Sequence, residues 1–145
     1  MICIVYLLLA WIERAYQPTP AQHNIEVVVT DMRAAQGRIR LGVFTTSDNF
    51  RQETLIQRIF IGKANMVGNT VSAQFTLPPG HYGFSILDDE NDNDRMDFNL
   101  IGLPVEGLGF SNYYHTGLSK PPFERFAFTV APQRVHKIKM KVRYM

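Results

Sequence analysis

Short segments in which apolar and polar residues alternate recur along the chain after residue 23. A period of two is the pattern of a β-strand with one face in a core, because successive side chains point to opposite faces. Turn-forming Gly, Pro, Asn and Asp separate these segments. The pattern is typical of an antiparallel sandwich or a small barrel, and we expect an all-β, seven-stranded Greek-key sandwich. The expected strands are Asn24–Met32, Arg38–Phe44, Ile56–Ile61, Thr70–Leu77, Tyr82–Leu87, Phe126–Val130 and Val135–Tyr144.

The last expected strand puts four cations on one face, since its apolar residues alternate with Lys137, Lys139, Lys141 and Arg143. One interpretation is an edge strand that lysines protect from aggregation. The other is a polyanion-binding stripe on a nucleic-acid-binding β-barrel. Single-stranded nucleic-acid binding needs aromatic residues among the cations, and this face has none. We therefore expect edge protection and no nucleic-acid partner. Elsewhere, one short helix is expected within residues 47–57, with Ser47 as its cap.

The chain opens with an apolar run from Ile2 to Ile12. A membrane-spanning helix needs about 20 residues, so the run is too short to span and has the length of a signal-peptide core. Thr19-Pro20-Ala21 offers small residues for cleavage, although no Lys or Arg precedes the run. The alternative is a buried N-terminal strand or helix. We expect a signal peptide over residues 1–21 and one exported domain over 22–145, periplasmic or secreted, without disulfides because Cys3 is the only cysteine.

Charge changes this picture at one place, the segment DDENDNDRMDFN at residues 88–99. Six of the 13 acids of the chain lie between Asp88 and Asp97, although the whole chain has a formal net charge of +2. So local an excess calls for a local explanation. Either the segment is a solvated acidic turn between strands, or it binds a cation that relieves the repulsion.

Calcium takes six to eight oxygen ligands, and EF-hand-type loops supply them from alternate positions. Counted from Asp89, position 6 of the loop is Asp94 instead of the usual Gly, and position 12 is Leu100 instead of a bidentate Glu. With an incomplete shell we expect weak Ca²⁺ binding, on the order of 0.1–1 mM. A second register would use Asp88, Glu90 and Asp92. The expected ligands are Asp89, Asn91, Asn93, the Arg95 carbonyl and Asp97, with Asp88, Asn99 and Glu106 as candidates for the missing one.

Three motifs in order carry a family resemblance: PPGHYGFSI, DENDNDRMDFNLIGLPVEGLGFSN and PPFERFAFTV. Together they resemble the bacterial domain-of-unknown-function family 2141 (DUF2141) over roughly residues 25–145. The resemblance implies an exported, single-domain bacterial protein with a β-sandwich and no assigned activity, and its members usually carry Gly where this chain has Asp94. The string LPPGHYGFSI also resembles a turn of transthyretin-like and Cna-B-like sandwiches, which are immunoglobulin-like in architecture.

The long segment 107–122 is rich in Gly and aromatic residues, and long loops are often functional. Its Phe110, Tyr113, Tyr114 and His115 are candidates for a recognition surface for a protein or glycan outside the cytoplasm; the alternative is that they pack inward. A small extracytoplasmic hydrolase using the acidic loop, Ser111 and His115 is the catalytic alternative. No nucleophile-elbow motif supports it and the four histidines form no zinc-ligand spacing, so we expect a binding or structural module without catalytic activity.

Overall fold

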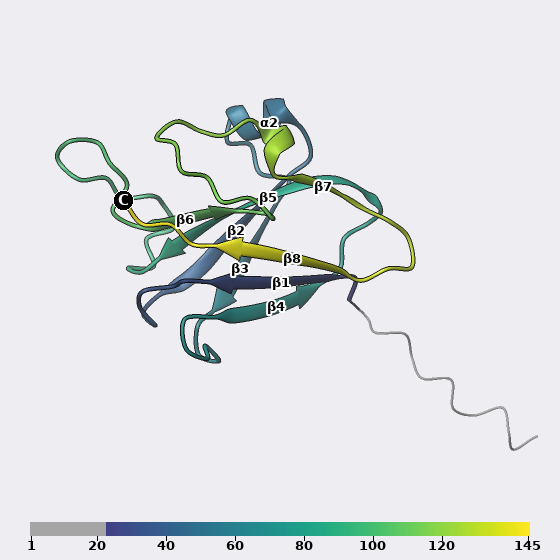
Figure 1. The fold of residues 1–145 in the computed structure, drawn as a ribbon, viewed down its shortest axis with the longest axis horizontal. Helices are drawn as coiled ribbons and strands as arrows, with labels where there is room; N and C mark the ends of the chain where they lie inside the picture. Colours follow the sequence, from purple (N-terminus) through teal and green to yellow (C-terminus); the bar gives the residue numbers. More distant parts are fainter. Residues whose placement is uncertain (1–22) are drawn as a thin grey trace, which may run out of the picture.

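The computed structural model describes residues 23–145 and is all-β, as the alternating pattern predicts (Figure 1). The expected signal peptide, residues 1–21, lies outside the described residues. No helix within residues 23–145 has the length and apolar character needed to cross a membrane. The elements are β1 (Ile25–Thr30), β2 (Arg38–Phe44), α2 (Ser47–Arg51), β3 (Gln57–Gly62), β4 (Val71–Phe75), β5 (Gly80–Asp89), β6 (Gly107–Phe110), η1 (Phe123–Arg125), β7 (Ala127–Val130) and β8 (His136–Lys141).

Two sheets pack face to face. One has the strand order β4-β1-β8, and the other has the order β3-β2-β5-β6, with β7 pairing to the first part of β5. Apolar residues from both sheets form the main core, and Ile25, Val27, Ile39, Leu41 and Met140 in it are fully buried. These are the residues that the alternation places on one face of each strand.

The described part of the chain has eight strands, so the expected count of seven is wrong. The missed strand is β6, whose sequence Gly-Leu-Gly-Phe is too short and too rich in glycine to resemble a strand. Both of its glycines are needed, since a side chain at Gly107 would collide with Val142 and Tyr144, and one at Gly109 with the Lys141 carbonyl. The wholly antiparallel expectation is also wrong, because β1 and β8 pair in parallel. Greek-key connectivity stays a prediction.

The lysines of β8 lie on its exposed face at the edge of the three-stranded sheet. Two of them approach acids of the β1 region: Lys137 lies 3.5 Å from Glu26 and Lys141 lies 3.8 Å from Asp31. The outer edge of β8 is partly covered, since Asn112 donates its backbone N–H to the Lys139 carbonyl and accepts the Lys139 N–H on its side chain. This placement is that of a protected edge strand.

A second, aromatic cluster covers one end of the outer face of the five-stranded sheet. The helix α2 begins after Thr46, whose side chain accepts the Asn49 N–H, so the cap is Thr46 and not Ser47. α2 and η1 lie side by side over this end (Figure 1). The rings pack at centroid distances of 4.9–6.0 Å, a range at which edge-to-face contacts are favourable. The cluster comprises Phe44, Phe50, Phe110, Phe123 and Phe126.

One ion pair is buried in the sandwich. Asp88 continues the core face of β5 after Phe84 and Ile86, and its side chain is fully buried against Lys63, which is 1 % exposed. Tyr144 donates its hydroxyl to Asp88 at 2.5 Å. Burial, and then the hydrogen bond to Asp88, raise the pKa of Tyr144. Lys63 also donates to the carbonyls of Ala34 and Gln36, so its charge ties the β1–β2 loop to β5.

Lys63→Met is expected to destabilise the protein by about 3–5 kcal/mol, because it leaves the Asp88 carboxylate buried without a cation. Urea unfolding monitored by circular dichroism measures the effect. The matched control is Lys120→Met, which breaks the half-exposed pair with Glu53 and should cost no more than about 1 kcal/mol. Adding Asp88→Leu to Lys63→Met should recover much of the loss in stability. Equal destabilisation by Lys63→Met and Lys120→Met would contradict the role assigned to the buried pair.

Candidate functional site

The acidic loop starts from a buried carboxylate. Asp89 is the last residue of β5 and is fully buried. Its two oxygens accept the backbone N–H groups of Asn93 at 3.0 Å and Asp94 at 2.9 Å. The side chain at position 1 therefore folds the following residues back over the end of the strand.

The next polar side chains of the loop converge on Asp97. Asn91 and Asn93 donate their side-chain amides to the same oxygen, Asp97 Oδ2, at 2.7 and 2.8 Å. Their own amide oxygens accept the N–H groups of Asn93 and Arg95, which tightens two successive turns. The carbonyl oxygen of Arg95 accepts no hydrogen bond from residues 23–145. The loop thus brings the side chains of positions 3, 5 and 9 to one point.

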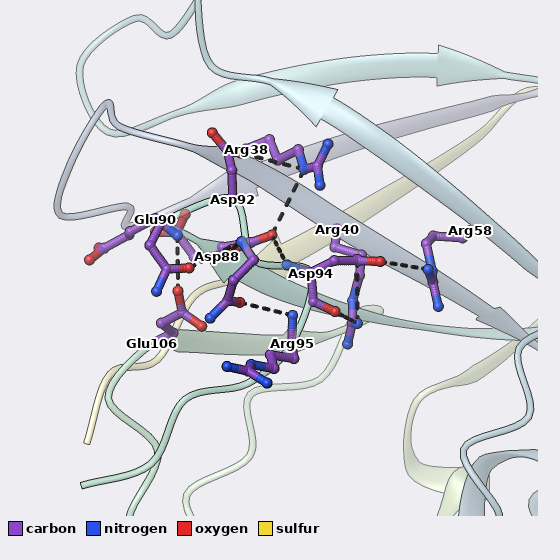
Figure 2. Close-up of polar contacts among 12 residues, drawn as sticks. Arg38, Arg40, Arg58, Asp88, Glu90, Asp92, Asp94, Arg95 and Glu106 are labelled. Carbon is purple, nitrogen blue, oxygen red and sulfur yellow. Dashed lines mark hydrogen bonds and ion pairs between the residues drawn. The ribbon is translucent and has the colours of Figure 1, made fainter.

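Position 6 adopts the backbone conformation that loops of this type require. Asp94 has φ +63°, in the left-handed region that favours Gly and that Asp tolerates better than most residues. Its side chain lies near two arginines of the outer sheet face, Arg40 and Arg58 (Figure 2). Arg58 binds its Oδ2 at 2.6 Å, and Arg40 binds its carbonyl at 2.5 Å. These arginines were not among the predicted site residues; their outward positions on β2 and β3 were the only signal.

Glu106 reaches the loop from the residue before β6. It is 4 % exposed, and its Oε1 accepts the Glu90 N–H at 3.1 Å (Figure 2). Its Oε2 is buried and has no hydrogen-bond partner within residues 23–145. Burial raises the pKa of Glu106, and the negative charges of Asp97 and Asp89 raise it further; the backbone N–H groups of Glu90 and Asp97 offset only part of this. Glu106 is therefore a third carboxylate beside the loop, with one oxygen uncommitted.

The other candidate ligands are engaged elsewhere. Asp88 lies on the opposite face of β5 from Asp89 and binds Lys63. Asn99 accepts the N–H groups of Ile101 and Leu103 and so shapes the hairpin tip that carries the exposed Leu100. The second register does not converge: Glu90 pairs with Arg33 at 2.8 Å and Asp92 lies 3.4 Å from Arg38.

The loop and Glu106 together offer hard oxygen donors of the kind that Ca²⁺ takes. They are the carboxylates of Asp89, Asp97 and Glu106, the side-chain amides of Asn91 and Asn93, and the free backbone carbonyl of Arg95. Among residues 23–145 no three His, Cys, Asp or Glu side chains are already gathered as metal ligands. The amides of Asn91 and Asn93 now present nitrogen to Asp97, so metal coordination requires them to turn their oxygens inward. The loop has oxygen donors and a backbone conformation suited to a cation. A bound cation would replace the present hydrogen bonds of Asn91 and Asn93 to Asp97.

The aromatic segment 107–122 divides between the interior and the surface. Phe110 is buried in the aromatic cluster, Tyr113 and His115 are half-buried, and Tyr114 is exposed with Lys141 over its ring. Ser111 is fully buried, accepts the Phe84 N–H and donates to the Phe126 carbonyl. His115 instead bonds the Ser119 carbonyl. The structure therefore does not bring Ser111 and His115 together.

The raised pKa of Glu106 predicts a pH dependence. A carboxyl group whose folded pKa lies above its unfolded value contributes stability that is present below the unfolded pKa and lost as pH rises through the folded pKa. Glu106→Gln keeps an acceptor for the Glu90 N–H without the charge. In chelator, its free energy of unfolding should rise relative to wild type as pH goes from about 4.3 towards 8.

Urea unfolding at several pH values measures this difference, with Glu90→Gln as the matched control. The hydrogen bond to Arg33 lowers the pKa of Glu90, so this variant should become less stable relative to wild type over the same interval. A Glu106→Gln difference that is flat with pH, or that shrinks, would contradict an unfavourable charge at Glu106.

Comparison with known proteins bears on the family alone. Neither a curated protein nor a solved structure matches the chain. A family model does match, described as "Uncharacterized protein conserved in bacteria (DUF2141)", over residues 27–138. This range runs from β1 into β8 and includes the acidic loop and Glu106. The chain belongs to the DUF2141 family of bacterial proteins, as its three motifs predict.

Proposed function

We propose that the protein is a non-enzymatic binding or structural module whose acidic loop binds calcium and is ordered by it. The observation that carries the proposal is the buried carboxylate of Glu106, with one unpartnered oxygen, beside the charges of Asp89 and Asp97. Glu106 supplies the carboxylate that the loop lacks at its own position 12, where Leu100 stands. A dication at this point would meet three carboxylates, of which Asp89 already has Arg38 at 3.8 Å and Asp97 has Arg95 at 3.9 Å.

The shell that the loop offers is suited to Ca²⁺ more than to Mg²⁺. Mg²⁺ demands a near-ideal octahedron of six close ligands, whereas Ca²⁺ accepts six to eight oxygens in irregular geometry. Here the donors come from a strand end, a curled loop and a residue 17 positions beyond Asp89, which is an irregular set. Coordination also competes with the present amide hydrogen bonds to Asp97, which favours weak binding, on the order of 0.1–1 mM, as in extracellular modules.

A weak site of this kind suits a compartment with abundant calcium, so the metal proposal fits an exported protein, periplasmic or secreted. The apolar run at Ile2–Ile12 and the bacterial family support the same localisation. In this setting, calcium occupancy would hold the loop in one conformation and so present the neighbouring loops, residues 99–122, as a recognition surface. The partner would be a ligand outside the cytoplasm.

Thermal unfolding with 10 mM CaCl₂ against chelator tests the metal. With a dissociation constant of 0.1–1 mM, calcium should add roughly 1.4–2.7 kcal/mol and raise the Tm by several degrees, and 10 mM MgCl₂ should add much less. Glu106→Gln and Asp97→Asn should each remove most of the shift.

The matched control is Asp92→Asn, which removes one charge from the same loop at a side chain that pairs with Arg38 and does not face Asp97. This variant should keep the calcium shift. No shift in the wild type would refute calcium binding, and a shift kept in full by Glu106→Gln would refute Glu106 as a ligand.

A further inference from the structure

A cleft of about 460 Å³ lies on the outer face of the five-stranded sheet, the face turned away from the main core. Two small residues meet in its floor, where Gly42 on β2 pairs directly with Ser85 on β5, and the Leu55 side chain packs over Gly42. Leu87 and Leu108, which are also paired, continue the floor toward the acidic loop. Ligand pockets of proteins have volumes of about 300–1,000 Å³ and mostly apolar linings, and this cleft falls in that range.

The walls of the cleft are apolar side chains that solvent reaches. The loop after β5 contributes Met96 and Phe98, and the segment before η1 contributes Leu118. Phe98 is 61 % exposed, Leu118 77 % and Met145, at the end of the chain, 40 %. Large apolar side chains that gather around one hollow mark a binding site more often than isolated ones do. An apolar ligand in the cleft would cover the parts of these side chains that face it.

The polar groups of the cleft are few and favour a negative charge. Arg40, Arg58 and Lys120 line it with one acidic side chain, Glu53, which pairs with Lys120. Cations still outnumber acids when Asp94 is counted, since it binds Arg40 and Arg58 from the loop side. Each of these guanidinium groups hydrogen-bonds Asp94 through Nη1 alone, which leaves its other N–H donors without a partner among residues 23–145.

A polar handle also lies in the floor. The hydroxyl of Ser85 makes no hydrogen bond within residues 23–145 and lines the cleft beside Gly42. Besides the charged groups, the polar lining consists of Ser85, Ser119 and His115. A surplus of cationic donors beside many apolar side chains suits a molecule with an apolar body and one anionic end. A glycan would need many more hydrogen-bonding partners than this floor provides.

We propose that this cleft binds a free single-chain amphiphile that ends in a carboxylate. The apolar chain lies on Leu55, Leu87 and Leu108 beside Phe98 and Leu118. The carboxylate is held by the spare N–H groups of Arg40 and Arg58, or by Lys120 in place of Glu53. This inference rests on the binding role proposed above but not on its calcium part, so it is tested in chelator.

Isothermal titration of the full-length protein with decanoate, 1-decanol and decyltrimethylammonium, each below its micelle concentration, separates charge from apolar contact. Decanoate should bind at least about tenfold more tightly than decyltrimethylammonium, because the cation meets like charges. Lys120→Gln or Arg58→Gln should reduce decanoate binding more than decanol binding. No binding of decanoate, or equal binding of all three chains, overturns the proposal.

A blocking variant tests the location. Ser85→Phe fills the hollow and should weaken decanoate binding by about tenfold or more, whereas Ser72→Phe, which places the same ring on the exposed side of β4, should not. If Ser85→Phe fails to fold, Phe98→Ser combined with Leu118→Ser should weaken binding from two exposed positions. Undiminished binding in the folded cleft variants overturns the proposal. If the protein binds decanoate but its Tm does not rise with calcium, only the metal proposal is refuted.

Discussion

A buried carboxylate is costly unless a proton, a cation or a full set of hydrogen bonds compensates its charge. The backbone N–H groups of Glu90 and Asp97 stabilise the Glu106 carboxylate only in part, because two other carboxylates lie nearby and no cation pairs with it within residues 23–145. Asp88, which pairs across the sheet with Gly107, the residue after Glu106, has a compensated charge, with Lys63 and Tyr144 as partners. The contrast between these two buried acids is the constraint on which the proposed metal site depends.

The acidic loop is held from two sides by different means. Asp89 holds its backbone through two N–H groups, and Asp94 is clamped by Arg40 and Arg58 on the outer sheet face. The same loop supplies Met96 and Phe98 to the wall of the cleft. The loop is thus shared by the two proposed sites, and its order would affect both.

Sequence periodicity predicted most strands because their core faces are strictly alternating, as in Ile25, Val27 and Val29. It missed β6, because the two glycines of this strand are required by close packing and have low β-propensity. Gly107 packs against Val142 and Tyr144, and Gly109 against the Lys141 carbonyl. It also missed the parallel pairing of β1 with β8, since the two strands lie at opposite ends of the chain and no local pattern encodes their contact.

The loop positions were predicted from alternation alone, and the structure brings Asn91, Asn93 and Asp97 together as that pattern indicates. The surroundings were beyond prediction, because which face of β5 holds Asp88 and which cations reach Asp94 follow from the sheet register. Glu106 stood among three candidates, and its partners distinguish it: Asp88 binds Lys63 and Asn99 binds the hairpin backbone, whereas Glu106 keeps one buried oxygen without a partner within residues 23–145. The most direct test is a crystal structure of the protein grown with CaCl₂. A metal bound about 2.3–2.6 Å from oxygens of Asp89, Asp97 and Glu106 is the predicted result, and Asn91 and Asn93 still bonded to Asp97, with no metal between them and Glu106, would contradict it.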